Sequence, residues 1–331
     1  MPKTFTDLER RALNGPTMGT RWSALFHAPA SFDAAPLHAA MAAAVDEVDR
    51  QMSGWKPESD LNRLNAAAPG SWVTLPKALM DVLSTALAIG RASDGAFDIG
   101  IGDAVTAWGF GPAAADPASI RAARLRDRRP AHEVLELNVP RGRARKHAPM
   151  HFDLNGIAKG YGVDRLTEAA RGFGIEGALL AIDGELRALG SQTDGLPWVV
   201  AVETPDPDRR TVHSILELTD TAVATSGDYR HWVDVGDRRL GHTMDPRRGM
   251  PLSAAPGSVT VLADQCMHAD AWATAMMVLG EKQGEALAET IGLPVLFLHR
   301  GNAHDVGSSR FSTGANMPAH HRSVSGLAAA D

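Results

Sequence analysis

Two oxygen-bearing side chains lie four residues apart in a segment that is otherwise largely apolar. The segment is HADAWATAMMVLG, residues 268–280, and the two residues are Asp270 and Thr274. In an α-helix this spacing places the carboxylate next to the hydroxyl on one face, as two adjacent oxygen ligands. The alternative is structural: Asp270 favours the first turn of the helix through its charge, and Thr274 bonds to its own backbone.

A second segment, DLNGIAKGYGVDRL, has the residue types of an anion-binding turn. Asp153 ends an extended run, and Asn155-Gly156 opens a helix, where a glycine lets a ligand approach the backbone. The free N–H groups at a helix start suit a phosphate. Lys159, about one turn further on, supplies positive charge. An N-capped helix with an exposed lysine explains the same residues, so both interpretations stay open.

Residues 223–251 contain a histidine beside a loop. Gly236-Asp237 predicts a hairpin turn between two strand-like runs. His242 then leads into a loop at 245–249. A histidine can act as a general base there because its pKa lies near working pH. The alternative is a structural or surface histidine.

Two further loops contain residues that are typical of ligand contact. In residues 52–65, Ser59 is positioned to cap a short helix, and Trp55 precedes it. A loop tryptophan stacks on a planar ring or packs on the core. Residues 95–112 contain five glycines, which bring the backbone close to another strand or to a ligand.

The elements that must position these residues alternate along the chain, which favours an α+β fold. An apolar stripe predicts a helix at 34–52, and the proline at position 76 predicts one at 76–92. A third helix is predicted at 156–170. Strands are predicted at 20–27, 178–190, 198–203, 214–224, 258–263 and 294–299. We expect residues 111–130 to form a segment that runs over the surface, called the excursion below. No linker divides the chain, so we expect one large unit.

Composition narrows the class of protein. The chain has 331 residues, of which 44% are hydrophobic, enough for a sizeable core. A net charge of -6 gives no indication of a basic surface that would bind nucleic acid. The single cysteine, Cys266, excludes an internal disulfide. No stretch approaches the ~18 consecutive apolar residues of a membrane helix, and no signal peptide is evident, so we expect a cytoplasmic protein with no membrane span.

Seven stretches, in this order, resemble the FAD:protein FMN transferase family, also called ApbE-like proteins. They are residues 18–22, 52–65, 95–112, 153–166, 224–232, 242–251 and 258–280. The resemblance implies a single large α+β domain with mixed or antiparallel sheets, flanking helices and a central FAD cleft. It places this domain at 18–313, after an N-terminal extension at 1–17 and before a disordered tail at 314–331.

The resemblance also implies an activity. Members of this family move the FMN half of FAD onto a threonine, or sometimes a serine, of an acceptor flavoprotein and release AMP. The implied acceptor segment is a short Asp-containing stretch that ends in Ser/Thr-Gly/Ala-Ala/Ser-Thr, and it must lie in another protein. Mg²⁺ is the implied cofactor, bound by Asp270, Thr274 and a backbone oxygen of Gly156. Mg²⁺ prefers hard oxygen ligands, few of them carboxylates.

The resemblance also implies roles for single residues of this chain. His242 matches the histidine that deprotonates the acceptor, and with Asp270 it forms the implied catalytic pair. The positions implied to contact FAD are Met18, Trp55, Ala96, Phe97, Asp98, Asp153, Lys159 and Met244.

Three positions depart from the family pattern. Trp55 replaces the usual tyrosine, and Gly100 replaces a threonine. Asp183-Gly184-Glu185 replaces Gly-Gly-Asp, which adds a carboxylate. That carboxylate repels phosphate if it faces the cleft and is harmless if it points to solvent.

Two other functions use the same residues: an FAD pyrophosphatase giving FMN and AMP, and a non-catalytic FAD-binding assembly factor. The chain also lacks the N-terminal lipid-bearing cysteine of many relatives, which favours a soluble form.

Overall fold

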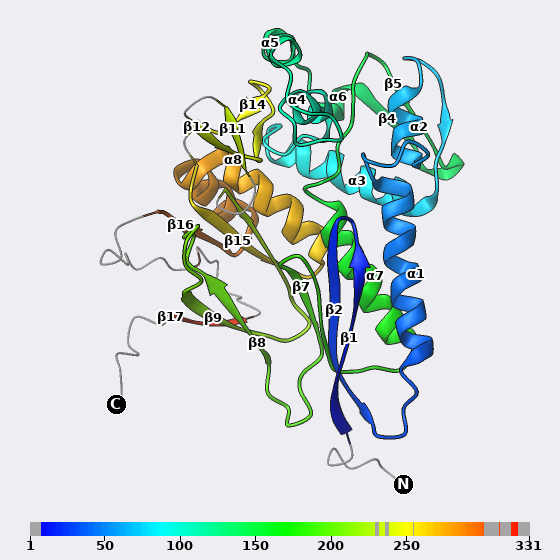
Figure 1. Ribbon diagram of the computed structural model, residues 1–331, viewed down its shortest axis with the longest axis vertical. Coiled ribbons are helices and arrows are strands. Elements are labelled where there is room, and N and C mark those ends of the chain that lie inside the picture. Colours follow the sequence, from blue (N-terminus) through cyan, green and yellow to red (C-terminus); the bar gives the residue numbers. More distant parts are fainter. Residues whose placement is uncertain are drawn as a thin grey trace.

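The computed structural model describes residues 8–228, 232–235, 238–253, 255–300, 311 and 319–323, and it has the expected α+β fold (Figure 1). Within these residues, no helix is both long and apolar enough to cross a membrane.

A seven-stranded sheet forms the centre of the molecule, and every neighbouring pair in it is antiparallel. Its strands, in spatial order, are β1 (Leu8–Thr17), β2 (Thr20–Pro29), β6 (Ala178–Ile182), β7 (Glu185–Leu189), β10 (Ala222–Gly227), β15 (Ser258–Ala263) and β16 (Val295–Leu298). The hairpin between β6 and β7 turns at Asp183 and Gly184, both at positive φ. Two-residue hairpin turns favour such backbone angles.

The alternation of side chains along the strands creates two buried faces. In β16, Val295 and Phe297 pack with the long helix α8 (Cys266–Ile291), while Leu296 and Leu298 face the other side. There they meet a three-stranded sheet with the order β17 (Ala319–Ser323), β9 (Val212–Leu218) and β8 (Trp198–Glu203). Successive side chains of a strand point to opposite faces, so one strand serves both layers.

Three helices cover the first face of the sheet (Figure 1). Helices α1 (Ala35–Met52) and α7 (Ala158–Gly172) pack on β2 and β6, and α8 packs on β10 and β15. The α8 helix is buried on two sides, because Ala273 contacts β15 while Ala271 and Ala275 belong to a second core around α3 (Lys77–Ala92). In its N-terminal half, α8 therefore carries few polar side chains, among them Asp270 and Thr274.

The remaining elements surround one end of this layer. The helices are α2 (Asp60–Ala66), α4 (Gly102–Ala107), α5 (Pro117–Leu125) and α6 (Ala131–Val134), with 3₁₀ turns at Ile99–Ile101 and Val139–Arg141. A small sheet has the order β3 (Val73–Thr74), β5 (Arg143–Lys146), β4 (Leu135–Asn138). Two hairpins complete the fold: β11 (Trp232–Val235) with β12 (Arg238–Gly241), and β13 (Met244–Asp245) with β14 (Met250–Pro251). The first confirms the hairpin expected at residues 236–237, which lie outside the described residues.

Most of the predicted elements are present. The helices expected at 34–52 and 76–92 are α1 and α3, and the strands at 198–203 and 258–263 are β8 and β15. The helix expected from Gly156 begins two residues later, at Ala158.

The prediction of one strand at 214–224 is wrong, because β9 and β10 belong to different sheets. Asp220 between them has φ +47, a backbone angle that ends a strand. Its carboxylate accepts a hydrogen bond from Gly190 N at 2.9 Å, which fixes the turn.

The two ends of the chain differ from the expectations. Residues 8–17, in the expected N-terminal extension, form β1, which pairs with β2 along its whole length. Met18 and Gly19, both at positive φ, make the turn between them. In the tail expected to be disordered, residues 319–323 form β17, antiparallel to β9. The rest of that tail lies outside the described residues, and the domain limits stay a prediction.

Candidate functional site

A cleft with a volume of about 1030 Å³ lies where hairpin turns of the central sheet meet the start of α7 and one face of α8. This volume suits a ligand of cofactor size. The structure brings all the candidate residues to the walls of this cleft: Met18, Trp55, Ala96, Phe97, Asp98, Asp153, Gly156, Lys159, His242, Met244, Asp270 and Thr274. They come from separate segments between positions 18 and 274, so the fold assembles them.

The two oxygen-bearing residues of α8 lie against the start of α7, Asp270 beside Gly160 and Thr274 beside Gly156. Asp270 is almost fully buried, and its Oδ2 accepts a hydrogen bond from Gly160 N at 2.9 Å. A Cβ atom added to Gly156 would lie 3.0 Å from Thr274 Oγ1, so the backbone of this turn passes beside the hydroxyl. Ser226 Oγ, from the end of β10, lies 3.3 Å from the same atom. Ser226 lies in the resembling stretch at 224–232 but is not among the predicted site residues.

This donor set fits a divalent cation that also binds substrate oxygens. Among the described residues, no group of three or more His, Cys, Asp or Glu is arranged to hold a metal. Where α8 borders the cleft, it offers the Asp270 carboxylate and the Thr274 hydroxyl, with the backbone of Gly156 beside the hydroxyl. Mg²⁺ sites in phosphate-handling enzymes use one or two carboxylates and fill the remaining positions with water and phosphate oxygens. The residues present therefore fit Mg²⁺ better than they fit a metal with a full protein cage.

Burial makes the negative charge of Asp270 unfavourable in the protein alone. Burial raises the pKa of this carboxyl, although the Lys159 ammonium and the hydrogen bond from Gly160 N partly oppose the shift. A cation bound to Asp270 would stabilise the ionised form in the same way as Lys159 does.

Lys159 is held between two carboxylates of the β6–β7 hairpin. Its Nζ lies 2.8 Å from Glu185 Oε1 and 3.3 Å from Asp183 Oδ2. Desolvation lowers the pKa of Lys159, but the carboxylates of Glu185, Asp270 and Asp183 outweigh it, so the net shift is upward and the ammonium stays charged. Glu185 is buried, and burial raises its pKa. The Asp183-Gly184-Glu185 turn, whose sequence differs from the family pattern, therefore has both of its carboxylates at the cleft.

Asp153 and Asn155 form a compact turn before α7. The Asp153 carboxylate accepts hydrogen bonds from the backbone N of Asn155 at 2.9 Å and from its side-chain N at 3.0 Å. Burial raises the pKa of Asp153 to about 6, against the effect of the backbone hydrogen bond. This turn exposes Asn155 and directs Gly156 toward Thr274.

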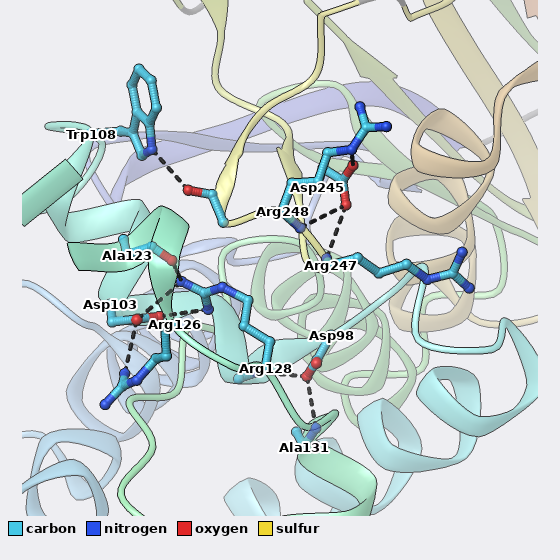
Figure 2. Close-up of polar contacts among 12 residues, drawn as sticks. Asp98, Asp103, Trp108, Ala123, Arg126, Arg128, Ala131, Asp245, Arg247 and Arg248 are labelled. Carbon is cyan, nitrogen blue, oxygen red and sulfur yellow. Dashed lines mark hydrogen bonds and ion pairs between the residues drawn. The ribbon is translucent and has the colours of Figure 1, made fainter. Parts of the chain in front are cut away.

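His242 and Met244 enter the cleft from the strand and turn that precede the loop at 245–249. The His242 ring lies edge-on to Phe110, with 6.4 Å between the ring centroids. Met244 is buried in β13 and pairs with Pro251 of β14. The Asp245 carboxylate accepts a hydrogen bond from Arg247 N at 2.9 Å and closes the loop (Figure 2).

Trp108, just after α4, holds this loop, and Asp103 of α4 holds the excursion at 111–130. Trp108 Nε1 donates to the backbone oxygen of Gly249 at 3.0 Å (Figure 2). Arg128 pairs with Asp103 at 3.0 Å and donates to the backbone oxygen of Ala123 at 2.9 Å. Most of α5 is exposed, as expected for a surface excursion, and none of residues 111–130, all of which the structure describes, lines the cleft.

Asp98 lines the cleft and also holds two neighbouring backbone segments by hydrogen bonds. Its Oδ1 accepts hydrogen bonds from Gly100 N at 2.8 Å and Ala131 N at 3.0 Å (Figure 2). A Cβ atom on Gly100 would lie 2.8 Å from Met150 Sδ, so the threonine usual in relatives would need Met150 to move.

Trp55 lies at the rim of the cleft with 58% of its surface exposed. Of the two interpretations given for it, packing on the core is wrong, because the side chain is exposed. Its backbone N is held by Ser53 Oγ at 3.1 Å, and Ser59 caps α2 through Asn62 N as expected. An exposed aromatic ring at the rim is available for stacking.

Comparison with known proteins identifies the family of this chain. The sequence profile of the ApbE family matches residues 18–297. The FAD:protein FMN transferase of Vibrio cholerae serotype O1 is 36% identical over 88% of this chain and 87% of its own length. The protein of the same name from Escherichia coli K12 is 32% identical over 88% of this chain and 84% of its own length.

Solved structures give the same result. The apo form of Pseudomonas stutzeri flavinyl transferase ApbE superposes with a TM-score of 0.80 at 32% identity, covering 93% of this chain and 98% of that one. The flavin transferase ApbE from Vibrio cholerae gives a TM-score of 0.79 at 34% identity, covering 89% and 95%. The resemblance seen in the sequence is confirmed, and the chain belongs to the ApbE family.

Proposed function

We propose that this protein is an FAD:protein FMN transferase. It transfers the FMN half of FAD to a threonine or serine hydroxyl of an acceptor flavoprotein, needs Mg²⁺ and releases AMP. The observation that carries the proposal is the meeting of Asp270, Thr274, Gly156 and Lys159 in one cleft that His242 also lines. The relatives that bear this enzyme name match most of the chain, which supports the same conclusion.

The chain's own residues divide the work of binding. Asp270, Thr274 and the backbone oxygen of Gly156 would hold the cation. When bound, Mg²⁺ neutralises charge on the phosphate oxygens during phosphoryl transfer. Lys159 adds a fixed positive charge at the same end of the cleft.

A second group of residues would position the rest of FAD. These residues form the apolar part of the wall, with Trp55 at the rim, and they are Met18, Ala96, Phe97 and Met244. Binding FAD along this wall would orient the pyrophosphate for attack, and orientation is a large part of catalysis in this class of reaction.

His242 is the proposed general base. It takes the proton of the acceptor hydroxyl while the hydroxyl oxygen forms a bond to the phosphorus on the FMN side. The bond from that phosphorus to the bridging oxygen breaks, and AMP leaves with that oxygen. A side chain whose pKa lies near working pH suits this role.

The test is incubation with FAD, Mg²⁺ and a protein carrying the Ser/Thr-Gly/Ala-Ala/Ser-Thr segment. We expect the acceptor to gain the mass of one FMN, with an equal amount of AMP released. An acceptor in which the last threonine is alanine is the control and should stay unlabelled. Free FMN without labelling would show a pyrophosphatase instead, and FAD binding without turnover would show an assembly factor.

The cytoplasmic location stays a prediction, which fractionation of cells can test.

A further inference from the structure

Helices α7 and α8 touch at a glycine directly beside Asp270. A Cβ atom on Gly160 would lie 2.4 Å from the backbone oxygen of Cys266 and 2.8 Å from Asp270 Cβ. Only a residue without a side chain allows this approach. The contact brings Gly160 N within 2.9 Å of Asp270 Oδ2, so the position of α8 relative to α7 decides where this carboxylate lies.

One turn after Gly160, a carboxylate of α7 binds the start of α8. Asp164 Oδ1 accepts a hydrogen bond from Cys266 N and Oδ2 accepts one from Met267 N, both at 2.9 Å. These are the first two N–H groups of the helix, which have no partner within the helix itself. The residue at the usual capping position, Gln265, makes no side-chain bond to them. The capping group of α8 therefore comes from another helix.

This anchor and the proposed cation ligands share one stripe of α8. Cys266, Asp270 and Thr274 follow one another at intervals of four residues, so they lie on the same face. Asp164 is itself buried, and Arg187 of β7 forms an ion pair with it. Its carboxylate thus links α7, α8 and the central sheet at one point.

We propose that Asp164 is a positioning residue for cation binding: through its two bonds to α8 it fixes the rotation and advance of this helix, so that Asp270 lies beside Gly160 and Thr274 beside Gly156. The inference rests on the proposed function, because it assigns Asp164 a task only if Asp270 and Thr274 bind the cation. A structural cap with no such task would stabilise α8 without affecting cation affinity.

The test compares Mg²⁺ binding by calorimetry for the full chain and for Asp164→Asn. Asparagine keeps the shape, but its amide nitrogen cannot accept a hydrogen bond from an N–H. We expect the Mg²⁺ dissociation constant to rise at least about tenfold, as for other residues that orient metal ligands. The Mg²⁺ concentration giving half-maximal FAD cleavage should rise in parallel, while the rate at saturating Mg²⁺ recovers in part.

Two control variants separate positioning from stability. Val163→Ala removes buried volume from the neighbouring residue of α7 and should lower Tm without changing Mg²⁺ affinity. Asp116→Asn alters the same kind of cap, on α5, where Asp116 Oδ2 accepts from Ser119 N at 2.7 Å. It should leave Mg²⁺ affinity unchanged as well.

The outcomes are distinguishable. A folded Asp164→Asn protein that binds Mg²⁺ as wild type does would overturn the positioning role and leave the proposed function intact. A wild-type protein that binds no Mg²⁺ would overturn both. If Asp164→Asn does not fold, Asp164→Ser, whose hydroxyl keeps one acceptor, undergoes the same titration with the same expected loss of affinity.

Discussion

The Lys159 ammonium lies 2.8 Å from Glu185 Oε1, which joins the first turn of α7 to the β6–β7 hairpin at the wall of the cleft. The pair holds one positive charge where the proposed substrate carries its phosphates. Burial raises the pKa of Glu185, and the neighbouring cation opposes part of this shift.

Replacing Lys159 with methionine should weaken FAD binding at least about tenfold, because a hydrogen bond to a charged group contributes about 1.5–3 kcal/mol. Quenching of flavin fluorescence measures the dissociation constant. Lys159→Arg, which keeps the charge, should bind FAD within about threefold of wild type, in line with a contact worth under 1 kcal/mol. Equal affinity in Lys159→Met and wild type would show that Lys159 does not contact the substrate.

The thermal stability of Lys159→Met should depend on pH differently from that of wild type. Without Lys159, burial keeps the pKa of Glu185 above its ordinary value, so the folded state binds a proton more tightly than the unfolded state does. The stability from this proton is present at low pH and is lost as pH rises through the folded-state pKa. The Tm of Lys159→Met should therefore lie closer to that of wild type at about pH 5 than at about pH 8. A constant difference in Tm would contradict this account.

Asp183 is the carboxylate that this chain adds to the usual turn, and it lies 3.3 Å from Lys159 Nζ. Asp183→Asn removes the charge but keeps a residue that tolerates positive φ. We expect FAD to bind several-fold more tightly, because one charge repelling the phosphates is gone and Lys159 keeps Glu185. Titration at low and high salt checks this, since the difference should shrink as salt screens the charge. Unchanged affinity at low salt would mean that Asp183 does not face the phosphates.

His242→Ala should slow FMN transfer by about 10²–10⁴-fold, the usual effect of losing a general base. The dissociation constant for FAD should change much less, because the proposed role of His242 concerns the acceptor hydroxyl. Single-turnover labelling measures the first quantity and flavin fluorescence the second. A variant that loses FAD binding and transfer to the same degree would identify His242 as a binding residue instead.

Trp108→Phe removes the donor to the backbone oxygen of Gly249 while filling most of the same space. The free energy of unfolding should fall by about 1–3 kcal/mol, because a buried carbonyl is left without its partner. Urea titration measures this loss. Phe110→Leu is a comparison in the same cluster that leaves the hydrogen bond intact. Full stability of Trp108→Phe would show that the bond does not hold the loop at 245–249.

The sequence predicts local features of this protein well, for reasons visible in particular residues. The spacing of Asp270 and Thr274 is a property of one helix, so periodicity alone places both on one face. Ser59 caps α2 within three residues of its own position. The motif order, compared with a known family, then named the other residues that line the cleft.

Contacts made across long stretches of chain were not predictable in this way. The bonds of Asp164 to Cys266 and Met267 span more than 100 residues, as does that of Gly160 to Asp270. The break between β9 and β10 depends on Asp220 at a positive φ, which a run of strand-forming residues on both sides conceals. In each case the tertiary pairing, rather than local propensity, decides the outcome.

The central claim is that Asp270 and Thr274 hold the cation that makes FAD reactive. Mass spectrometry of an acceptor incubated with FAD, with and without Mg²⁺, tests it for wild type, Asp270→Ala and Thr274→Val. We expect wild type to add one FMN only when Mg²⁺ is present, Asp270→Ala to add none, and Thr274→Val to need a higher Mg²⁺ concentration. Labelling by Asp270→Ala at the wild-type rate and with the wild-type Mg²⁺ requirement would contradict the claim.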